Sequence, residues 1–276
     1  MYTMGEGYDP GFLHAALDLP CPVRPTVLLN YTHFSVRLQP SRRLAAVVGV
    51  NINGSELRPL ERSGTWHFDP RVPREQQAGP EVYRNNRLDR GHLVRRLDPV
   101  WGHPEAARRA NQDTFAFPNA APQAADFNQD KELWRGLEDH VLNHADLHDA
   151  RLSVFTGPVL ADDDLPYRGI RVPRQFWKIA AWTADGALAS AGFVLDQSPL
   201  LEGLELEQAI RRRLAAGEPP PLGPFRTFQV PMTLIAGLAG LDLAVLAAAD
   251  RLTREALRAG PTPAAARLKD AAQIRL

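Results

Sequence analysis

Gln175-Phe-Trp-Lys-Ile-Ala-Ala-Trp182 and Ala187-Leu-Ala-Ser-Ala-Gly-Phe-Val-Leu195 are the two stretches that decide the fold. Each is an apolar run of strand length, and the Asp185-Gly186 pair between them is a hairpin turn signal. A third run, Leu152-Ser-Val-Phe-Thr156, ends at a Gly157-Pro158 turn. The three runs predict strands of one buried sheet, the last two joined as a hairpin.

Strands and helices mix along the rest of the chain. Residues 26–53 have strand character, with an apolar run at 44–50, and residues 114–117 form a short strand-like piece. Helical composition or spacing marks residues 104–112, 132–147, 204–215 and 242–259. Because the order lacks a strict βαβ rhythm, we expect an α+β fold.

One domain is expected over residues 26–259, with a helical C-terminal part over residues 204–259. Residues 1–25 are rich in Pro and Gly and predict an irregular lead-in. Residues 260–276 are expected to form a loose tail.

The composition is that of a folded chain without excess charge. The 276 residues are 44% hydrophobic and 23% charged, and the formal net charge is +0. A polyanion would therefore have to bind a local basic patch. The single cysteine, Cys21, excludes an internal disulfide and a cysteine-based zinc site.

Neither the N-terminal residues nor the most apolar stretch of the chain indicates a membrane protein. The first ten residues lack the basic and apolar regions of a secretory signal, so we expect a cytoplasmic protein as encoded, with non-classical export left open. The most apolar stretch, Val230–Ala249, carries Pro231 and Asp242, and core segments are expected there instead of a membrane span.

The stretch richest in chemistry is Tyr83-Arg-Asn-Asn-Arg-Leu-Asp-Arg-Gly-His-Leu-Val-Arg-Arg-Leu-Asp98. Taken alone it could be an exposed loop of mixed charge. Phosphodiester hydrolysis, however, needs a base of near-neutral pKa, which His92 supplies, and cations on the non-bridging oxygens, which arginine supplies bidentately. Gly91 lets the backbone approach a substrate closely.

A second polar cluster follows at residues 111–138. Asn128 and Glu138 carry the hard oxygen donors that Mg²⁺ prefers. The structural alternatives are a helix N-cap for Asn128 and a solvated helix face for Glu138.

These motifs together resemble the signature of the DNA/RNA non-specific endonuclease family, the ββα-metal (His-Me finger) nucleases. The blocks are Asp89-Arg-Gly-His92 (the DRGH motif), Asn119-Ala-Ala-Pro-Gln123, Asn128-Gln129, and Trp134 with Leu137-Glu138. The resemblance covers residues 31–197. It implies a central, mainly antiparallel sheet flanked by helices, with a ββα-metal active-site motif.

The resemblance also implies a role for each motif residue in a Mg²⁺-dependent, sugar-non-specific endonuclease. His92 is the implied general base, and Asn128 the sole direct protein ligand of a hydrated Mg²⁺, for which we expect Mn²⁺ to substitute. Glu138 would hold the metal through its waters or directly. Arg62 and Arg90 would stabilise the transition state. The remaining implied roles are orientation, by Asp89 and Asn119, and contact with substrate phosphates, by Arg87, Arg95 and Arg96.

The implied partners are DNA and RNA, which would be bound without regard to sequence. No membrane partner is expected. A homodimer and a protein inhibitor remain open as further partners.

Three points stay open at this level. The stretch from Asn128 to Glu138 is about two residues longer than the family pattern, so Glu132 competes for the metal's outer shell. Arg62 is favoured as the arginine ahead of the motif over Arg58, Arg71 and Arg74. The alternative functions are a catalytically inactive nucleic-acid-binding relative and a zinc hydrolase built on His140, His144 and His148, which recur every four residues.

Overall fold

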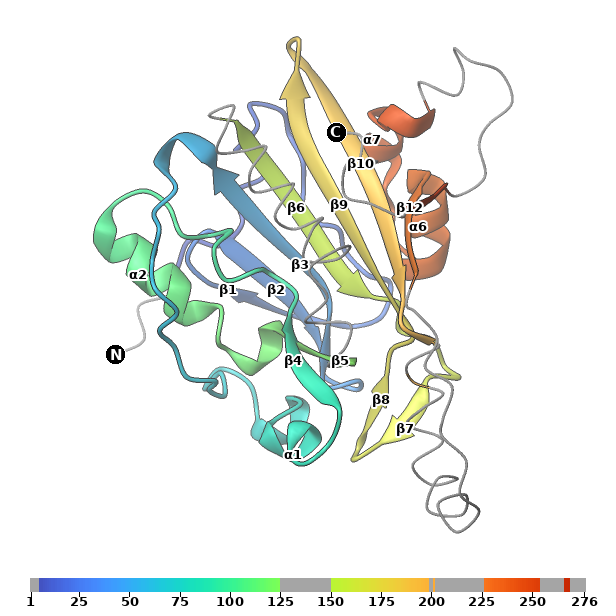
Figure 1. Cartoon of the computed structure of the whole chain (residues 1–276). Helices are drawn as coiled ribbons and strands as arrows, with labels where there is room; N and C mark the ends of the chain where they lie inside the picture. Colours follow the sequence, from blue (N-terminus) through green and yellow to red (C-terminus); the bar gives the residue numbers. More distant parts are fainter. Residues whose placement is uncertain (1–4, 125–149, 199–200, 202–225, 254–265, 269–276) are drawn as a thin grey trace.

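An eight-stranded antiparallel sheet is the frame of the protein (Figure 1). It is seen in a computed structural model that describes residues 5–124, 150–198, 201, 226–253 and 266–268. The strand order is β1-β2-β3-β6-β9-β10-β11-β12, and each adjacent pair is antiparallel. The strands are β1 (Val27–Asn30), β2 (Phe34–Gln39), β3 (Leu44–Asn53), β6 (Arg151–Pro158), β9 (Gln175–Ala184), β10 (Ala187–Asp196), β11 (Arg226–Val230) and β12 (Ala266–Leu268).

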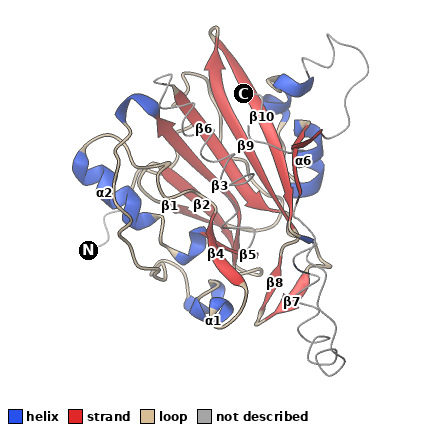
Figure 2. Ribbon diagram, viewed as in Figure 1, coloured by secondary structure: helices blue, strands red, loops and turns tan. Residues whose placement is uncertain are grey.

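The predicted hairpin lies in the interior of this sheet, between β6 and β11 (Figure 2). β9 and β10 pair along their full lengths, with Ala184 opposite Ala187. The connecting residues Asp185 (φ 51°) and Gly186 (φ 74°) both adopt the left-handed conformation of a tight two-residue turn. The three strands expected from the apolar runs are therefore confirmed.

Two hydrophobic layers cover the two faces of the sheet. On β3, Val48, Val50 and Ile52 face one layer, which includes Leu93 and Ala121 from the segments that carry the motif residues. Val47 faces the other layer, which contains four buried residues of the N-terminal lead-in: Tyr8, Phe12, Leu13 and Leu17. The described part of the lead-in, residues 5–25, has no helix or strand, and it contributes these four side chains to the core.

Helices flank the sheet at its two sides (Figure 1). α2 (Pro104–Asp113) matches the helix expected at residues 104–112 and lies on the side of β1 and β2. α6 (Met232–Ala239) and α7 (Ala244–Ala248) pack against β10. The short elements are α1 (Pro80–Tyr83), η1 (Gly54–Glu56), η2 (Arg74–Gln76) and η3 (Phe117–Asn119). This arrangement confirms the α+β class and the mainly antiparallel sheet.

Two smaller antiparallel pairs complete the described structure. β4 (Leu88–His92) pairs with β5 (Ala120–Ala124), and β7 (Leu165–Tyr167) with β8 (Ile170–Val172). The β4–β5 pair supplies the two strands of the expected ββα motif, whose helix falls outside the described residues. The helices expected at 132–147 and 204–215 lie outside them too.

The strand expected at residues 114–117 is wrong. Thr114 and Phe115 form a turn that closes α2, with the Thr114 amide donating to the Ala110 carbonyl at 3.2 Å. Ala116 forms a single isolated bridge with His67, Pro118 then lies in η3, and a regular strand begins at Ala120. The stretch predicted as one long helix over 242–259 is also interrupted, because α7 ends at Ala248.

The apolar stretch at residues 230–249 is built from the end of β11 and the two helices α6 and α7. Within the described ranges, no helix has the length and apolar character needed to cross a membrane.

Candidate active site

The candidate site is built on the β4–β5 pair. His92 lies opposite Ala120, Gly91 opposite Ala121, and Asp89 opposite Gln123. A Cβ atom at Gly91 would overlap the Gln123 side chain, which lies across the glycine. The glycine of the motif is therefore required by the packing of its own strand pair.

His92 lies in an aromatic cage. Its ring centroid is 4.6 Å from that of Trp66 and 5.1 Å from that of Phe115, which meets it edge-on at 86°. Its Nε2 atom is buried and has no hydrogen-bond partner in the described part of the chain. Burial, reinforced by the charges of Arg62 and Arg96, lowers the pKa of His92 to about 3. The imidazole is thus neutral at pH 7, the state in which it can accept a proton.

Arg90 faces the same aromatic neighbour as His92. Its guanidinium carbon is 5.9 Å from the centre of the Trp66 ring. Because Arg90 and His92 are two residues apart on β4, their side chains leave the strand on the same side. The exposed Arg90 side chain and the caged imidazole can therefore reach one substrate group.

Arg62 lies in the loop between η1 and η2, is exposed, and is close enough for its charge to lower the pKa of His92. Each of the three competing arginines is engaged elsewhere: Arg58 with the Gly102 carbonyl, Arg71 with Asp69, and Arg74 over the Phe68 ring. The geometry therefore favours Arg62 among the four.

The other predicted phosphate-binding and orienting residues flank His92. Arg87 precedes β4 and is exposed, whereas Arg95 follows it and is half-buried. Asp89 leaves β4 on the side opposite to His92. Arg96 is already engaged, because its Nη1 atom donates to the Leu60 carbonyl at 3.0 Å.

Asn119 is a buried link between the segment after His92 and the end of α2. Its Oδ1 accepts from the Val94 amide at 2.8 Å, and its Nδ2 donates to the carbonyls of Val94 (3.0 Å) and Thr114 (2.9 Å). The Leu93 amide donates to the Asn119 carbonyl at 3.0 Å. Asn119 therefore orients the chain that follows His92, while its effect on catalysis stays a prediction.

Sequence reasoning gave no role to Trp66 or Asn111. Trp66 forms one wall of the His92 cage, and the buried Asn111 contacts the loop of Arg62. For Trp66 the available signal was an aromatic residue four positions after Arg62. For Asn111 no signal was available, because its main partner in that loop is a backbone carbonyl.

The metal-binding half of the predicted site lies outside the described residues. This applies to Asn128, Glu138 and Glu132, and equally to the alternative zinc ligands His140, His144 and His148. Among the residues that the structure does describe, no group of three or more His, Cys, Asp or Glu side chains is arranged to hold a metal ion. The metal ligands stay predictions.

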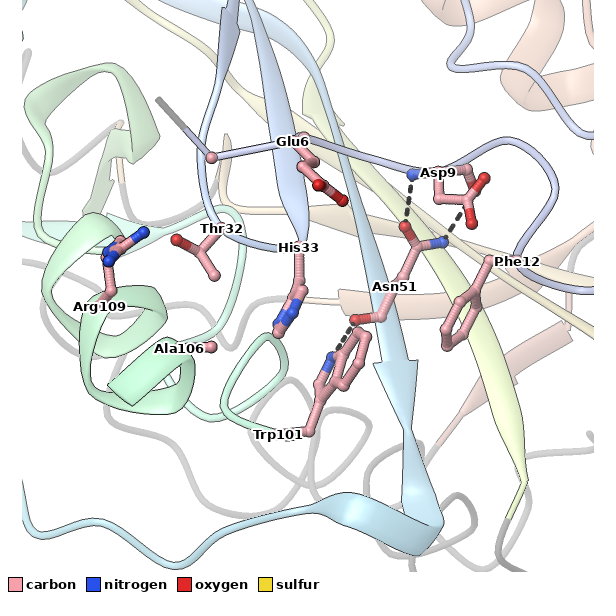
Figure 3. Close-up of a pocket in the computed structure, with 11 residues that line it drawn as sticks. Glu6, Asp9, Phe12, Thr32, His33, Asn51, Trp101, Ala106 and Arg109 are labelled. Carbon is pink, nitrogen blue, oxygen red and sulfur yellow. Dashed lines mark hydrogen bonds between the residues drawn. The ribbon is translucent and has the colours of Figure 1, made fainter. Parts of the chain in front are cut away.

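A cavity of about 570 Å³ lies apart from the candidate site (Figure 3). His33 stacks on Trp101 at 3.6 Å between ring centroids, and its Nδ1 is 2.9 Å from the Pro99 carbonyl. Asn51 closes one wall by bonding the backbone of Asp9. None of the motif residues lines this cavity, so it is a different feature from the His92 site.

The fold and the site define a class: α+β proteins with a large antiparallel sheet and a separate antiparallel strand pair, β4–β5, that presents a caged histidine among arginines. The sequence model of the DNA/RNA non-specific endonuclease family matches residues 15–250, and the chain belongs to that family.

Curated relatives of the chain include two endonucleases G. The chain is 39% identical over 263 residues to an uncharacterized protein, y4fB, of Sinorhizobium fredii. The alignment covers 87% of this chain and 39% of the relative. It is 27% identical to mitochondrial endonuclease G of Bos taurus (51% of this chain, 49% of the relative) and to that of Homo sapiens (55% and 56%). The chain thus spans 39% to 56% of the length of these relatives.

The fold itself resembles a chain in the crystal structure of a complex between EndoG and EndoGI. The TM-score is 0.56 at 20% identity, over 78% of this chain and 84% of that one.

Proposed function

We propose that this protein is a Mg²⁺-dependent, sugar-non-specific endonuclease that hydrolyses phosphodiester bonds of DNA and RNA. The observation that carries the proposal is the setting of His92: its imidazole lies between Trp66 and Phe115, and the guanidinium group of Arg90 lies against the same Trp66 ring. Membership of the family supports nuclease activity in general.

In this proposal His92 takes the proton of a water that attacks phosphorus in line with the leaving oxygen. A neutral imidazole can accept this proton, and the Nε2 atom of His92 has no hydrogen-bond partner in the described part of the chain. Arg62 and Arg90 bind the non-bridging oxygens, where negative charge grows in the transition state. Because these contacts read only phosphates, cleavage would not depend on base sequence.

The amide oxygen of Asn128 and the carboxylate of Glu138 are the donors that would hold Mg²⁺, and both are hard oxygen ligands suited to it. Bound there, the ion would act as a Lewis acid that stabilises charge on the phosphate and the leaving 3′-oxygen. Mn²⁺ has the same ligand preference, and we expect it to replace Mg²⁺.

The deciding experiment compares cleavage of supercoiled plasmid and of RNA by the native protein and by the His92→Ala variant, with Mg²⁺ and with EDTA. We expect His92→Ala to lower turnover by about 10²–10⁴-fold, the effect of losing a general base, without unfolding the protein. His14→Ala is the matched control, because His14 is exposed and its ring contacts Arg151 instead of the site. EDTA is expected to stop cleavage.

The other outcomes identify the alternatives. Native activity in a folded His92→Ala protein would refute the general base, and loss of activity in His144→Ala instead would indicate a zinc hydrolase. Substrate that stays uncut both with Mg²⁺ and with EDTA, by a protein that still binds nucleic acid, would indicate an inactive nucleic-acid-binding relative.

An inhibitor protein is a further partner within this proposal. The structural neighbour was solved in a complex described as showing inhibition of EndoG. A cell that contains an active, sequence-indifferent nuclease needs such control, so co-purification with an inhibiting protein is the corresponding expectation.

A further inference from the structure

The backbone before Arg62 is held although no regular secondary structure surrounds it. The Nη1 atom of Arg96 donates to the Leu60 carbonyl at 3.0 Å and lies 3.4 Å from the Glu61 carbonyl. Arg96 reaches this loop from the chain just after β4. The two residues directly ahead of Arg62 are therefore tied to the segment that carries His92.

The backbone after Arg62 is held by Asn111. Its Nδ2 donates to the Ser63 carbonyl at 2.5 Å, and its Oδ1 accepts from Arg96 Nη1 at 3.0 Å. Asn111 is buried in the last turn of α2. The side-chain amide of Asn111 thus bonds both Arg96 and the loop. We call these two residues the Asn111–Arg96 clamp.

Positive charge is concentrated around this clamp. Burial and the neighbouring charges of Arg62 and Arg95 lower the pKa of Arg96. Like charges at short range repel one another, and carbonyl and amide oxygens on Arg96 offset part of that repulsion. The clamp therefore offsets the repulsion between the guanidinium group of Arg96 and that of Arg62.

We propose that Asn111 and Arg96 are positioning residues that hold the Arg62 loop in register with His92. Arg96 then acts through the loop it binds, and it is Arg62 that contacts the scissile phosphate. The inference rests on the proposed nuclease function.

The reason such a clamp matters is geometric. The ends of the loop are fixed by other bonds, such as that of the Arg58 amide to the Val100 carbonyl and that of the His67 amide to the Phe115 carbonyl. Between those points, Arg96 and Asn111 hydrogen-bond to the backbone of residues 60, 61 and 63. A displacement of about 1 Å of a group that stabilises the transition state can cost about 10²-fold in rate.

The decisive test is a double-mutant cycle between Asn111 and Arg62. Asn111→Asp keeps the side-chain volume and an acceptor for Arg96 but removes the donor to the Ser63 carbonyl. We expect kcat/KM for plasmid cleavage to fall about 10- to 100-fold, mainly in kcat, and less than about threefold when Arg62→Ala is already present. Gln112→Glu is the matched control, because it makes the same chemical change at the next, exposed residue of α2.

If Asn111→Asp lowers kcat/KM by the same factor in the native protein and in Arg62→Ala, the inference is overturned. If Asn111→Asp fails to fold, Arg96→Lys tests the other arm, since it keeps the charge and removes the guanidinium geometry. The same dependence on Arg62 is expected.

A second readout does not need activity. Amide hydrogen exchange across residues 57–66 should become faster in Asn111→Asp and stay unchanged in Gln112→Glu. Unchanged exchange in Asn111→Asp would overturn the clamp. A native protein that cuts neither DNA nor RNA would instead overturn the proposed function, while the exchange experiment would still decide the clamp.

Discussion

At the scale of single residues, the cage around His92 determines which protonation state is available. In water a histidine has a pKa of about 6.5, and half of such a population would carry a proton at that pH. Burial between Trp66 and Phe115, with Arg62 and Arg96 nearby, lowers the pKa of His92 to about 3. The ring therefore stays neutral over the whole physiological range.

Opening the cage should raise that pKa. In an NMR titration of the native protein, we expect the His92 ring signals to stay constant between pH 5 and 8. In Trp66→Ala the His92 ring would be hydrated, and we expect its signals to titrate. Each unit of increase lowers the neutral fraction about tenfold below the new pKa, so the variant should lose activity at acidic pH first. Titration of native His92 near its ordinary pKa would refute this account.

The same shift has a consequence for stability. The unfolded chain binds a proton at His92 near pH 6.5, and the folded chain does so only near pH 3. The stabilising contribution is therefore complete above about pH 6.5 and is lost as the pH falls toward 3. Replacing His92 by Gln should make the free energy of unfolding less dependent on pH across this window.

At the scale of elements, the β4–β5 pair depends on one glycine. A methyl group at Gly91 would overlap the buried Gln123 side chain. We expect Gly91→Ala to lower the free energy of unfolding by about 1–3 kcal/mol, the usual cost of overpacking, and the double variant with Gln123→Ala to recover part of it. Chemical denaturation of the four proteins measures this, and a neutral Gly91→Ala would show that Gln123 moves aside freely.

Local sequence predicted some elements well and others poorly. The β9–β10 hairpin was predictable because long apolar runs flank an Asp-Gly turn. β5 was not, since Ala120-Ala-Pro-Gln-Ala124 has no β-branched residue and contains a proline. Its strand pairing comes from a tertiary contact with β4, which no local pattern encodes.

The candidate site divides in the same way. The motif residues His92, Arg90 and Asn119 could be found by their types and order along the chain. The clamp could not, because Arg96 and Asn111 bind backbone carbonyls, and any residue at positions 60, 61 and 63 would offer the same acceptor.

At the scale of the whole molecule, the proposed binding of nucleic acid would have to arise from a local surface. The formal net charge is +0, so the protein as a whole exerts little attraction on a polyanion. The arginines of the site, by contrast, are gathered around one imidazole, and the charges of Arg62 and Arg96 both act on His92. Affinity should therefore come from a small number of phosphate contacts.

Salt dependence measures that number. With Arg62, Arg87, Arg90 and Arg95 on phosphates, the slope of log K against log salt concentration should be about −3 to −4 for duplex DNA. Because these contacts read no bases, oligonucleotides of unrelated sequence should give the same slope and similar affinity. Fluorescence anisotropy on the inactive His92→Ala protein measures both, and Arg62→Ala should reduce the slope by about one. A flat salt profile, or a strong preference for one sequence, would mean that the protein binds nucleic acid through some surface other than this arginine group.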